Sequence, residues 1–251
     1  PVLLDRKFKM PSSQNWNLGV QHEVVKNLLV DLNYVGSKGT HLLRAVDGNA
    51  PNPAIVAELL AQGVPPNLLT GANLWFGGFD PSPVGNNAFF QAALNRSIAN
   101  SNYQAFQTTV TRRFSRGFQI QGAYTWSHAI DDASDPLVAA AGNRSFPRNS
   151  YNLAAERGNS DFDLRHRLVV NYTWELPLGH GRAYVAEGAL GRVLEGLQLS
   201  GITGVQTGHP YDIFGTRDSQ HTGLSDRAKL IGSPGDFSGC NLAGAPLYAG
   251  V

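Results

Sequence analysis

Long stretches of this chain alternate between apolar and polar residues with a period of two. In the clearest stretch, residues 117–132, every second position from Phe118 to Ile130 is apolar, aromatic, glycine or histidine, and the positions between them are Gln, Ala, Thr or Ser. Residues 164–176 repeat this pattern. Because successive side chains of a strand point to opposite faces, this alternation predicts strands that have two chemically different faces.

The same alternation predicts six strands. They lie near residues 14–25, 28–36, 103–114, 117–130, 164–176 and 197–207. The last is the weakest, because Ile202 falls on its polar face. A transmembrane strand needs about 9 to 11 residues, whereas strands of soluble proteins average about 5 or 6. The predicted lengths therefore favour strands that cross a membrane.

The connections between these strands alternate in length. Two are tight turns and one, residues 177–196, is of medium length, whereas residues 37–102, 129–163 and 208–251 form long loops. Short turns on one side and long loops on the other are typical of outer-membrane barrels. The sequence therefore predicts an all-β fold, an incomplete antiparallel transmembrane β-barrel of three hairpins. Within the first long loop, residues 52–61 predict a short helix with Pro53 near its first turn.

The alternation assigns each strand side chain to one of two faces. We expect the polar face to line a lumen and to contact a substrate or a plug. The predicted lumen-facing residues are Gln119, Gln121, Thr125, Arg165, Arg167, Asn171 and Glu175. We expect the apolar face to meet lipid, with aromatic belts at the two headgroup levels. The predicted belt residues are Trp16, Tyr34, Tyr124 and Trp126 toward the long loops, and Phe114, Phe118, Tyr172 and Trp174 toward the short turns.

A soluble antiparallel sandwich also has alternating strands. The outer face of a sandwich usually carries Lys and Glu, whereas the polar face predicted here is mostly Asn, Gln, Ser and Thr. Only 16% of the residues are charged, against about 25% in average soluble domains. A net charge of +1 also argues against a nucleic-acid partner, which needs a clustered basic surface. The composition therefore favours the membrane barrel.

Four segments resemble the barrel of TonB-dependent outer-membrane receptors of the Oar-like type. They are residues 15–42 (NWNLGVQHEVVKNLLVDLNYVGSKGTHL), 102–135 (NYQAFQTTVTRRFSRGFQIQGAYTWSHAIDDASD), 160–182 (SDFDLRHRLVVNYTWELPLGHGR) and 194–211 (LEGLQLSGITGVQTGHPY). The resemblance implies the outer membrane of a Gram-negative bacterium, and uptake of a scarce substrate with energy relayed by TonB. It also implies outer-membrane lipid, a plug domain, the TonB complex and an unidentified substrate as partners.

In that family these segments lie in the later part of a large barrel, after a carboxypeptidase-regulatory-like domain and a plug. This sequence shows no signal peptide, TonB box, plug or closing strand with a terminal aromatic residue. Single-chain bacterial barrels have at least about 8 strands, so six cannot close one. The resemblance therefore implies a fragment of a transporter barrel, truncated at both ends.

Two groups of charged residues are candidates for chemistry. Asp131, Asp132 and Asp135 cluster in the second long loop, but they lack the spacing of a calcium-binding loop, so a solvated loop is the favoured interpretation. In residues 161–167, the alternation separates His166 from four charged side chains on the polar face. We expect these four to form salt bridges in the lumen rather than to catalyse a reaction: Asp161, Asp163, Arg165 and Arg167.

Recognised catalytic motifs are absent from the sequence. There is no G-x-S-x-G nucleophile turn, no H-E-x-x-H zinc motif and no phosphate-binding loop, and Cys240 is the single cysteine. We therefore expect no enzymatic activity, no metal and no cofactor.

Two other functions stay open. The chain could belong to a structural or adhesive surface protein whose long loops bind partners. It could also be a soluble all-β module that binds or hydrolyses carbohydrate. The soluble module predicts that a second sheet covers the face that carries Trp126 and Trp174.

Overall fold

One antiparallel sheet of long strands forms the body of the protein. The computed structural model describes residues 2–69, 72–88, 90–115, 117–134, 146–179, 182, 184, 188–214, 218, 221, 224, 226–230 and 248–250. The main strands pair in the order β2-β3-β4-β5-β7-β8. They are β2 (Ser12–Val25), β3 (Leu28–Asp47), β4 (Ala93–Ser115), β5 (Phe118–Asp131), β7 (His166–Glu175) and β8 (Gln198–Gln206).

The described residues also form four short strands. β1 (Val2–Leu4) pairs in parallel with the start of β4, and β6 (Gly158–Asn159) pairs with the end of β5. β9 (Ala228–Leu230) and β10 (Tyr248–Gly250) form a separate two-stranded sheet.

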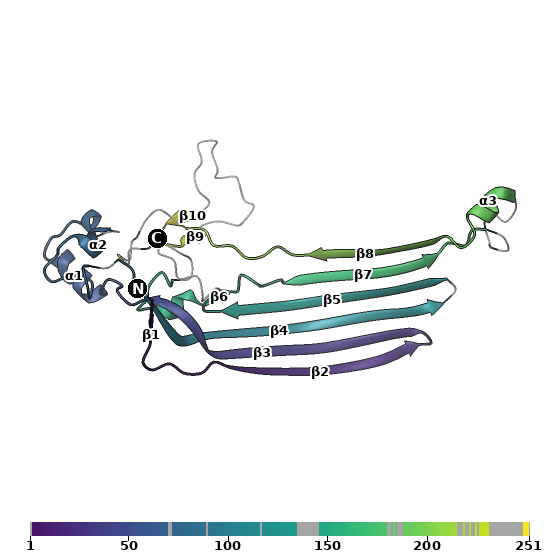
Figure 1. Ribbon diagram of the computed structural model, residues 1–251, viewed down its shortest axis with the longest axis horizontal. Helices are drawn as coiled ribbons and strands as arrows, with labels where there is room; N and C mark the ends of the chain where they lie inside the picture. The colour runs from purple at the N-terminus through teal and green to yellow at the C-terminus, as the bar shows by residue number, and fades with distance from the viewer. Residues whose placement is uncertain are drawn as a thin grey trace.

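The two ends of the long sheet differ (Figure 1). At one end, the turn side, β2 joins β3 and β4 joins β5 by tight turns, and β7 joins β8 through α3 (Gly188–Val193). At the other end, the loop side, lie α1 (Pro53–Ala61), α2 (Ala72–Phe76) and the short strands, together with the 3-10 helices η1 (Pro66–Leu68) and η2 (Leu153–Glu156). The predicted arrangement of short turns opposite long loops is therefore present, and the sheet is open. Among the described residues, no helix combines the length and hydropathy needed to cross a membrane.

The predicted helix in the first loop is confirmed as α1. The Asn52 side chain caps it by accepting a hydrogen bond from the backbone N–H of Ala54 at 3.0 Å, and Pro53 occupies the first turn. Behind α1 the loop has a small core of its own, which contains Val56, Leu59, Leu69, Leu74, Trp75 and Val84. The first long loop is therefore a folded module rather than an irregular connection.

The predicted boundaries of the long loops were too wide. β3 continues to Asp47 and β4 begins at Ala93, so strand replaces both ends of the predicted loop 37–102. β5 likewise runs to Asp131, and β6 and η2 lie within the predicted loop 129–163. The last four residues of β3 are all buried, and a strand that is buried on both faces shows no period-two alternation. Register irregularities between Gly39 and Leu43 also interrupt the pattern there.

Cross-strand register brings the apolar side chains into rows that run across the whole sheet. One row joins Val20, Leu32, Thr108, Tyr124, Leu168 and Val205, and the next toward the turn side joins His22, Val30, Val110, Gly122, Val170 and Thr203. Because the side chains of directly paired residues point to the same side, these rows form one continuous apolar face.

This apolar face is uncovered. Trp126 and Trp174 are 49% and 41% exposed on it, and none of the described residues forms a second sheet over it. The structure thus contradicts the covered face that a soluble module requires.

Aromatic rings cover two glycines of the apolar face. Gly36 pairs directly with Trp16, and Gly201 pairs directly with Tyr172. A methyl group added at Gly201 would lie 2.6 Å from the Tyr172 hydroxyl oxygen and 2.7 Å from its ring carbon Cζ. Gly201 therefore makes room for the tyrosine ring, which in turn covers the exposed glycine backbone.

This packing leads to a first prediction. Gly201→Val is expected to destabilise the sheet by about 1 kcal/mol, because Tyr172 must rotate away from the new side chain. Gly122→Val is the matched control, since Gly122 lies on the same face with no atom within 4 Å of an added methyl group. Urea unfolding of the complete protein in detergent micelles measures both changes. An equal loss for the two variants would contradict the packing of Tyr172 on Gly201.

Candidate functional site

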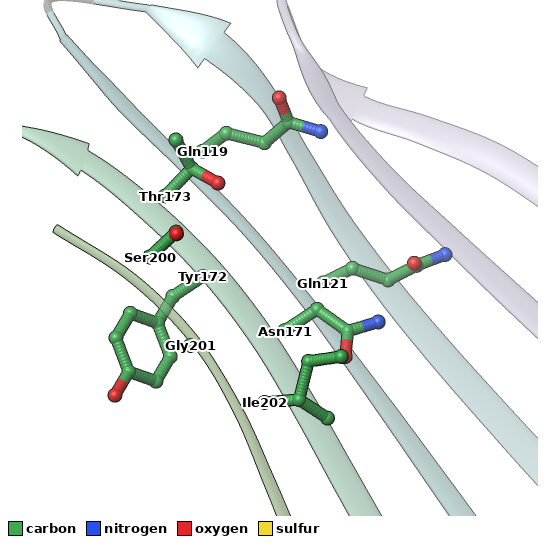
Figure 2. Close-up of a pocket in the computed structure, with 8 residues that line it drawn as sticks. All are labelled: Gln119, Gln121, Asn171, Tyr172, Thr173, Ser200, Gly201 and Ile202. Atoms are coloured by element: carbon green, nitrogen blue, oxygen red, sulfur yellow. The ribbon is translucent and has the colours of Figure 1, made fainter. Parts of the chain in front are cut away.

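Three of the predicted lumen-facing residues, Gln119, Gln121 and Asn171, lie together on the polar face of β5 and β7. Gln119 pairs with Thr173, and Gln121 pairs with Asn171. Together with residues of β8 they line an open hollow of about 320 Å³ (Figure 2). Figure 2 also shows that Tyr172 points away from Gln121 and Asn171, as the alternation requires. The hollow is uncharged and presents amide and hydroxyl groups beside the exposed apolar side chain of Ile202.

The other predicted lumen residues lie nearer the ends of the sheet. Thr125 and Arg167 are paired on the polar face toward the loop side. Arg165 precedes β7, which begins two residues later than predicted, and forms an ion pair with Asp163 at 3.1 Å. Glu175 ends β7 at the turn side and lies 3.8 Å from the guanidinium of Arg182.

On the opposite face, the predicted belt residues lie at two levels of the sheet. Trp16, Tyr34, Trp126 and Tyr124 lie toward the loop side, where the Tyr124 hydroxyl and His166 Nδ1 share a hydrogen bond of 2.8 Å. Phe118 pairs with Trp174 at the turn side, and Tyr172 lies one row further in. Phe114 falls in an irregular part of β4, between Arg112 and Ser115, so the register assigns it to neither face. The register also adds Phe106, the direct partner of both Tyr34 and Trp126, to the loop-side level.

A cavity of about 750 Å³ lies at the loop side, where β3, β5, η2 and the segment after β8 converge. We call it the mouth cavity. It is lined by Arg44, Asp131, Asp132, Ala133, Ser134, Glu156, Arg157, Gly158, Asn159, Asp161, Pro210, Tyr211, Asp212 and Arg227. Its volume lies within the range of small-molecule sites, about 300 to 1,000 Å³, although its lining is far more charged than that of most such sites.

Glu156 is the centre of the charged network in the mouth cavity. Its Oε2 lies 3.1 Å from Arg227 Nη2 and 3.7 Å from Arg44 Nη2, and its Oε1 accepts the backbone N–H of Arg148 at 2.8 Å. Arg227 also lies 3.5 Å from Asp212. These contacts connect the end of β3, the second loop and the segment after β8, so one carboxylate joins three parts of the chain.

Arg44 and Glu156 are nearly inaccessible to solvent, with side chains 3% and 5% exposed. Burial lowers the pKa of the Arg44 guanidinium, and the carboxylate of Glu156 opposes that shift. Arginine stays protonated in proteins, so the site holds a buried cation paired with a buried anion. The Nε atoms of Arg44 and Arg227 are both buried and have no hydrogen-bond partner among the described residues.

Sequence reasoning missed Arg44, Glu156, Arg227 and Asp212. Arg44 lay within a segment expected to be loop, and the other three lie far from it in the sequence. A lone arginine in a stretch of otherwise uncharged residues, as in LLRAV, is a weak signal for a buried ion pair, since charged residues are seldom buried without a partner. The partner itself is visible only in the folded chain.

The charged candidates named from the sequence have different partners in the structure, although Asp131, Asp132 and Asp161 all line the mouth cavity. Asp131 accepts hydrogen bonds from the Ser134 hydroxyl at 3.0 and 2.9 Å, whereas Asp132 pairs with Arg157 at 3.3 Å. Asp135 lies outside the described residues. Within the part of the chain that the structure describes, no group of three or more His, Cys, Asp or Glu side chains is placed to hold a metal ion.

A second buried carboxylate anchors the base of the folded loop module. Asp47 Oδ1 accepts the backbone N–H groups of Asn49 at 2.9 Å and Ala92 at 3.0 Å, so it joins the two ends of the module. Burial raises the pKa of Asp47, and this effect outweighs the two N–H donors, which favour the charged form. Burial and the charge of Asp47 also raise the pKa of Tyr151.

The raised pKa of Asp47 predicts a pH dependence. Because protonation is easier in the folded than in the unfolded chain, the module is most stable below the ordinary Asp pKa of 3.8 and loses stability as the pH rises through the raised value. Hydrogen exchange at the amides of Asn49 and Ala92, corrected for intrinsic rates, measures this loss. Asp47→Asn removes the titrating group and is expected to abolish the dependence. Protection that increases with pH would contradict the assignment.

The chain matches the sequence profile of the outer membrane beta barrel domain over residues 2–245. It belongs to this family. The protein is therefore an outer-membrane β-barrel protein, and the open antiparallel sheet is part of its barrel domain. Among solved structures, the domain resembles a chain of the FpvAI–pyocin S2 complex at 12% identity and a TM-score of 0.39, over 88% of this chain and 20% of that one. The chain thus spans one fifth of the length of that structure. No curated protein matches it.

Proposed function

We propose that this barrel domain belongs to a TonB-dependent receptor of the Oar-like type, which takes up a scarce substrate across the outer membrane. The single observation that carries the proposal is the mouth cavity, a preformed charged site at the loop side of a two-faced membrane sheet. A passive structural barrel has no need of buried charges held in a cavity of ligand size. A receptor that captures a dilute substrate does need such a site.

The two faces of the sheet have separate roles in this proposal. The apolar face meets lipid, and the polar face, with Gln119, Gln121, Thr125, Arg167 and Asn171, lines the lumen. Substrate binds first at the loop side and then passes along the uncharged amides and hydroxyls of the lumen, which offer only weak sites and therefore do not trap it. In this proposal further strands close the barrel in the complete protein, and a plug fills its lumen.

The mechanism is tested by the affinity of the complete protein for TonB. The purified full-length protein, in detergent, is titrated calorimetrically with the periplasmic domain of TonB from the same bacterium. A one-to-one complex is expected. Absence of binding, in a protein whose folding is verified by circular dichroism, would contradict TonB-dependent uptake.

An adhesive surface protein is the second candidate, and the folded loop module favours it. The rings of Phe76 and Phe90, both in this module, stack with their centroids 6.0 Å apart. The two residues are 56% and 38% exposed. Exposed aromatic residues commonly anchor protein–protein contacts. Under this alternative the protein does not bind TonB, and Phe76→Ala reduces attachment of the cells to a surface or to other cells.

A further inference from the structure

The apolar face carries one arginine, Arg112, near its turn-side end. The register pairs Arg112 directly with Leu28 and Ile120, so its side chain projects from the same face as theirs. Of the side chains that the described strand pairs place on this face between the two aromatic levels, Arg112 is the only one that is permanently charged. On the lipid face of a barrel, a charge costs little near the headgroups and much more toward the midplane. Arg112 is therefore stable there only if its guanidinium reaches the headgroup level.

Within the described residues, the protein itself supplies no anion to Arg112. Arg112 is exposed and takes part in none of the ion pairs between these residues. Glu23, beside the neighbouring β2–β3 turn, lies on the polar face, and its Oε1 accepts the backbone N–H of Asn27 at 2.8 Å. Glu175, at the end of β7, also lies on the polar face, where it pairs with Arg182. The partner of Arg112 therefore comes from its surroundings.

Two further basic residues lie at the same corner of the sheet. The backbone N–H of Arg113 donates a hydrogen bond to the carbonyl oxygen of Asn27 at 2.9 Å, which joins the end of β4 to the β2–β3 turn (Figure 1). Lys26 belongs to this turn, and both basic residues are exposed and form no ion pair among the described residues. We call Lys26, Arg112 and Arg113 the basic corner. It places three cations, unpaired within the described chain, at the turn-side end of the apolar face.

The surroundings of the basic corner are the headgroups of one leaflet. Tyr172 lies in the same row as Arg112, and Phe118 and Trp174 lie one row closer to the turns. Aromatic belts mark the headgroup level of a bilayer, and a long arginine side chain reaches that level along the apolar surface. Short turns of outer-membrane barrels face the periplasm, so this is the periplasmic leaflet, which consists of phospholipids.

Phosphate is the anion of that leaflet, but its lipids differ in net charge. A guanidinium group binds a phosphate through two parallel hydrogen bonds. A zwitterionic lipid brings a cationic group of its own, which the three cations repel, whereas phosphatidylglycerol carries the phosphate charge alone. The excess of positive charge at the basic corner therefore favours an anionic lipid.

We propose that the basic corner binds the phosphate of an anionic phospholipid, phosphatidylglycerol, in the periplasmic leaflet. Arg112 contacts the phosphate from the apolar face, and Lys26 and Arg113 add attraction from the adjoining turns. The site goes beyond the proposed function, because it requires only that the apolar face meets lipid and requires neither TonB nor a substrate.

Native mass spectrometry of the complete protein, released from detergent micelles, tests the proposal by counting bound lipids. Phosphatidylglycerol is expected to bind about tenfold more tightly than phosphatidylcholine with the same acyl chains, since each basic residue adds to the attraction of an anionic lipid. Glycerol phosphate, which has the phosphate but no acyl chains, is expected not to displace the lipid. Equal binding of the two lipids, or displacement by glycerol phosphate at equal concentration, would overturn the proposal.

Variants locate the site. Arg112→Gln is expected to weaken phosphatidylglycerol binding about fivefold, the contribution of one basic residue at an anionic lipid surface. Arg112→Lys keeps the charge and is expected to keep most of the affinity, which separates the effect of charge from that of packing. Arg167→Gln is the matched control, because Arg167 is also exposed but lies on the polar face, away from lipid.

Two outcomes would refute the site: unchanged affinity in Arg112→Gln, or equal weakening by Arg167→Gln. Titration of the same preparations with TonB separates this proposal from the proposed function, because TonB binding does not depend on the basic corner.

Discussion

Val170→Arg is expected to prevent assembly of the complete protein in the outer membrane. Val170 lies in the row with Val30, Val110 and Gly122, near the middle of the apolar face. If this face meets lipid, the arginine is placed near the bilayer midplane, where a charge on a barrel costs about 2 to 4 kcal/mol. Leu168→Arg lies one row toward the loop side, beside Tyr124, and is expected to act in the same direction but more weakly, because the cost of a charge falls toward the headgroups. The folded barrel is quantified by its faster migration in gel electrophoresis without boiling.

Asn171→Arg is the control for these substitutions. Asn171 is the neighbour of Val170 on the same strand, but it lies on the polar face beside Gln121. An arginine there enters the lumen, so assembly is expected to stay close to that of the unmodified protein. Equal assembly of the Val170 and Asn171 variants would show that the two faces were assigned wrongly.

Glu156→Gln is expected to release the second long loop from the barrel. The substitution keeps an acceptor for the backbone N–H of Arg148 but removes the charge that faces Arg44 and Arg227. Arg227 retains Asp212, whereas the buried Arg44 loses its carboxylate partner. Breaking a buried ion pair in this way costs about 3 to 5 kcal/mol. Limited proteolysis within residues 146–163 measures the free energy of local opening.

An exposed ion pair of the same cavity provides the control for Glu156→Gln. Arg157 pairs with Asp132, but its side chain is 48% exposed. Arg157→Gln is therefore expected to change the opening free energy by only about 0 to 1 kcal/mol. Similar proteolysis of the Glu156 and Arg157 variants would contradict the central role of Glu156 in holding the loop.

The sequence predicted the strands well where each strand has one apolar and one polar face. The stretch around Tyr124 and Trp126 shows its full alternation, and β5 begins within one residue of its predicted start. The predicted strand boundaries were wrong where a strand no longer has one apolar and one polar face. Residues 44–47 of β3 are buried on both faces, so they carry no period-two signal although they are extended and paired.

The candidate site was predicted only in part, for a related reason. The polar face follows from alternation alone, which is local, so Gln121 and Asn171 could be placed beside each other once the strand order was guessed. The mouth cavity depends on contacts between residues far apart in the sequence, such as Arg44 with Glu156. No local pattern encodes the pairing of loop residues, since it arises from how the loops fold over the sheet.

The facing of the strands in the membrane is the central claim, and spin labels along β7 test it most directly. Single cysteines are introduced from His166 to Glu175 in the complete protein after Cys240 is replaced by serine, and each is labelled and reconstituted into lipid bilayers. Accessibility to oxygen is expected to peak at positions 168, 170 and 172, and accessibility to a polar nickel complex at 167, 169, 171 and 173. Accessibility that does not alternate, or alternation with the opposite phase, would contradict the assignment of the apolar face to lipid.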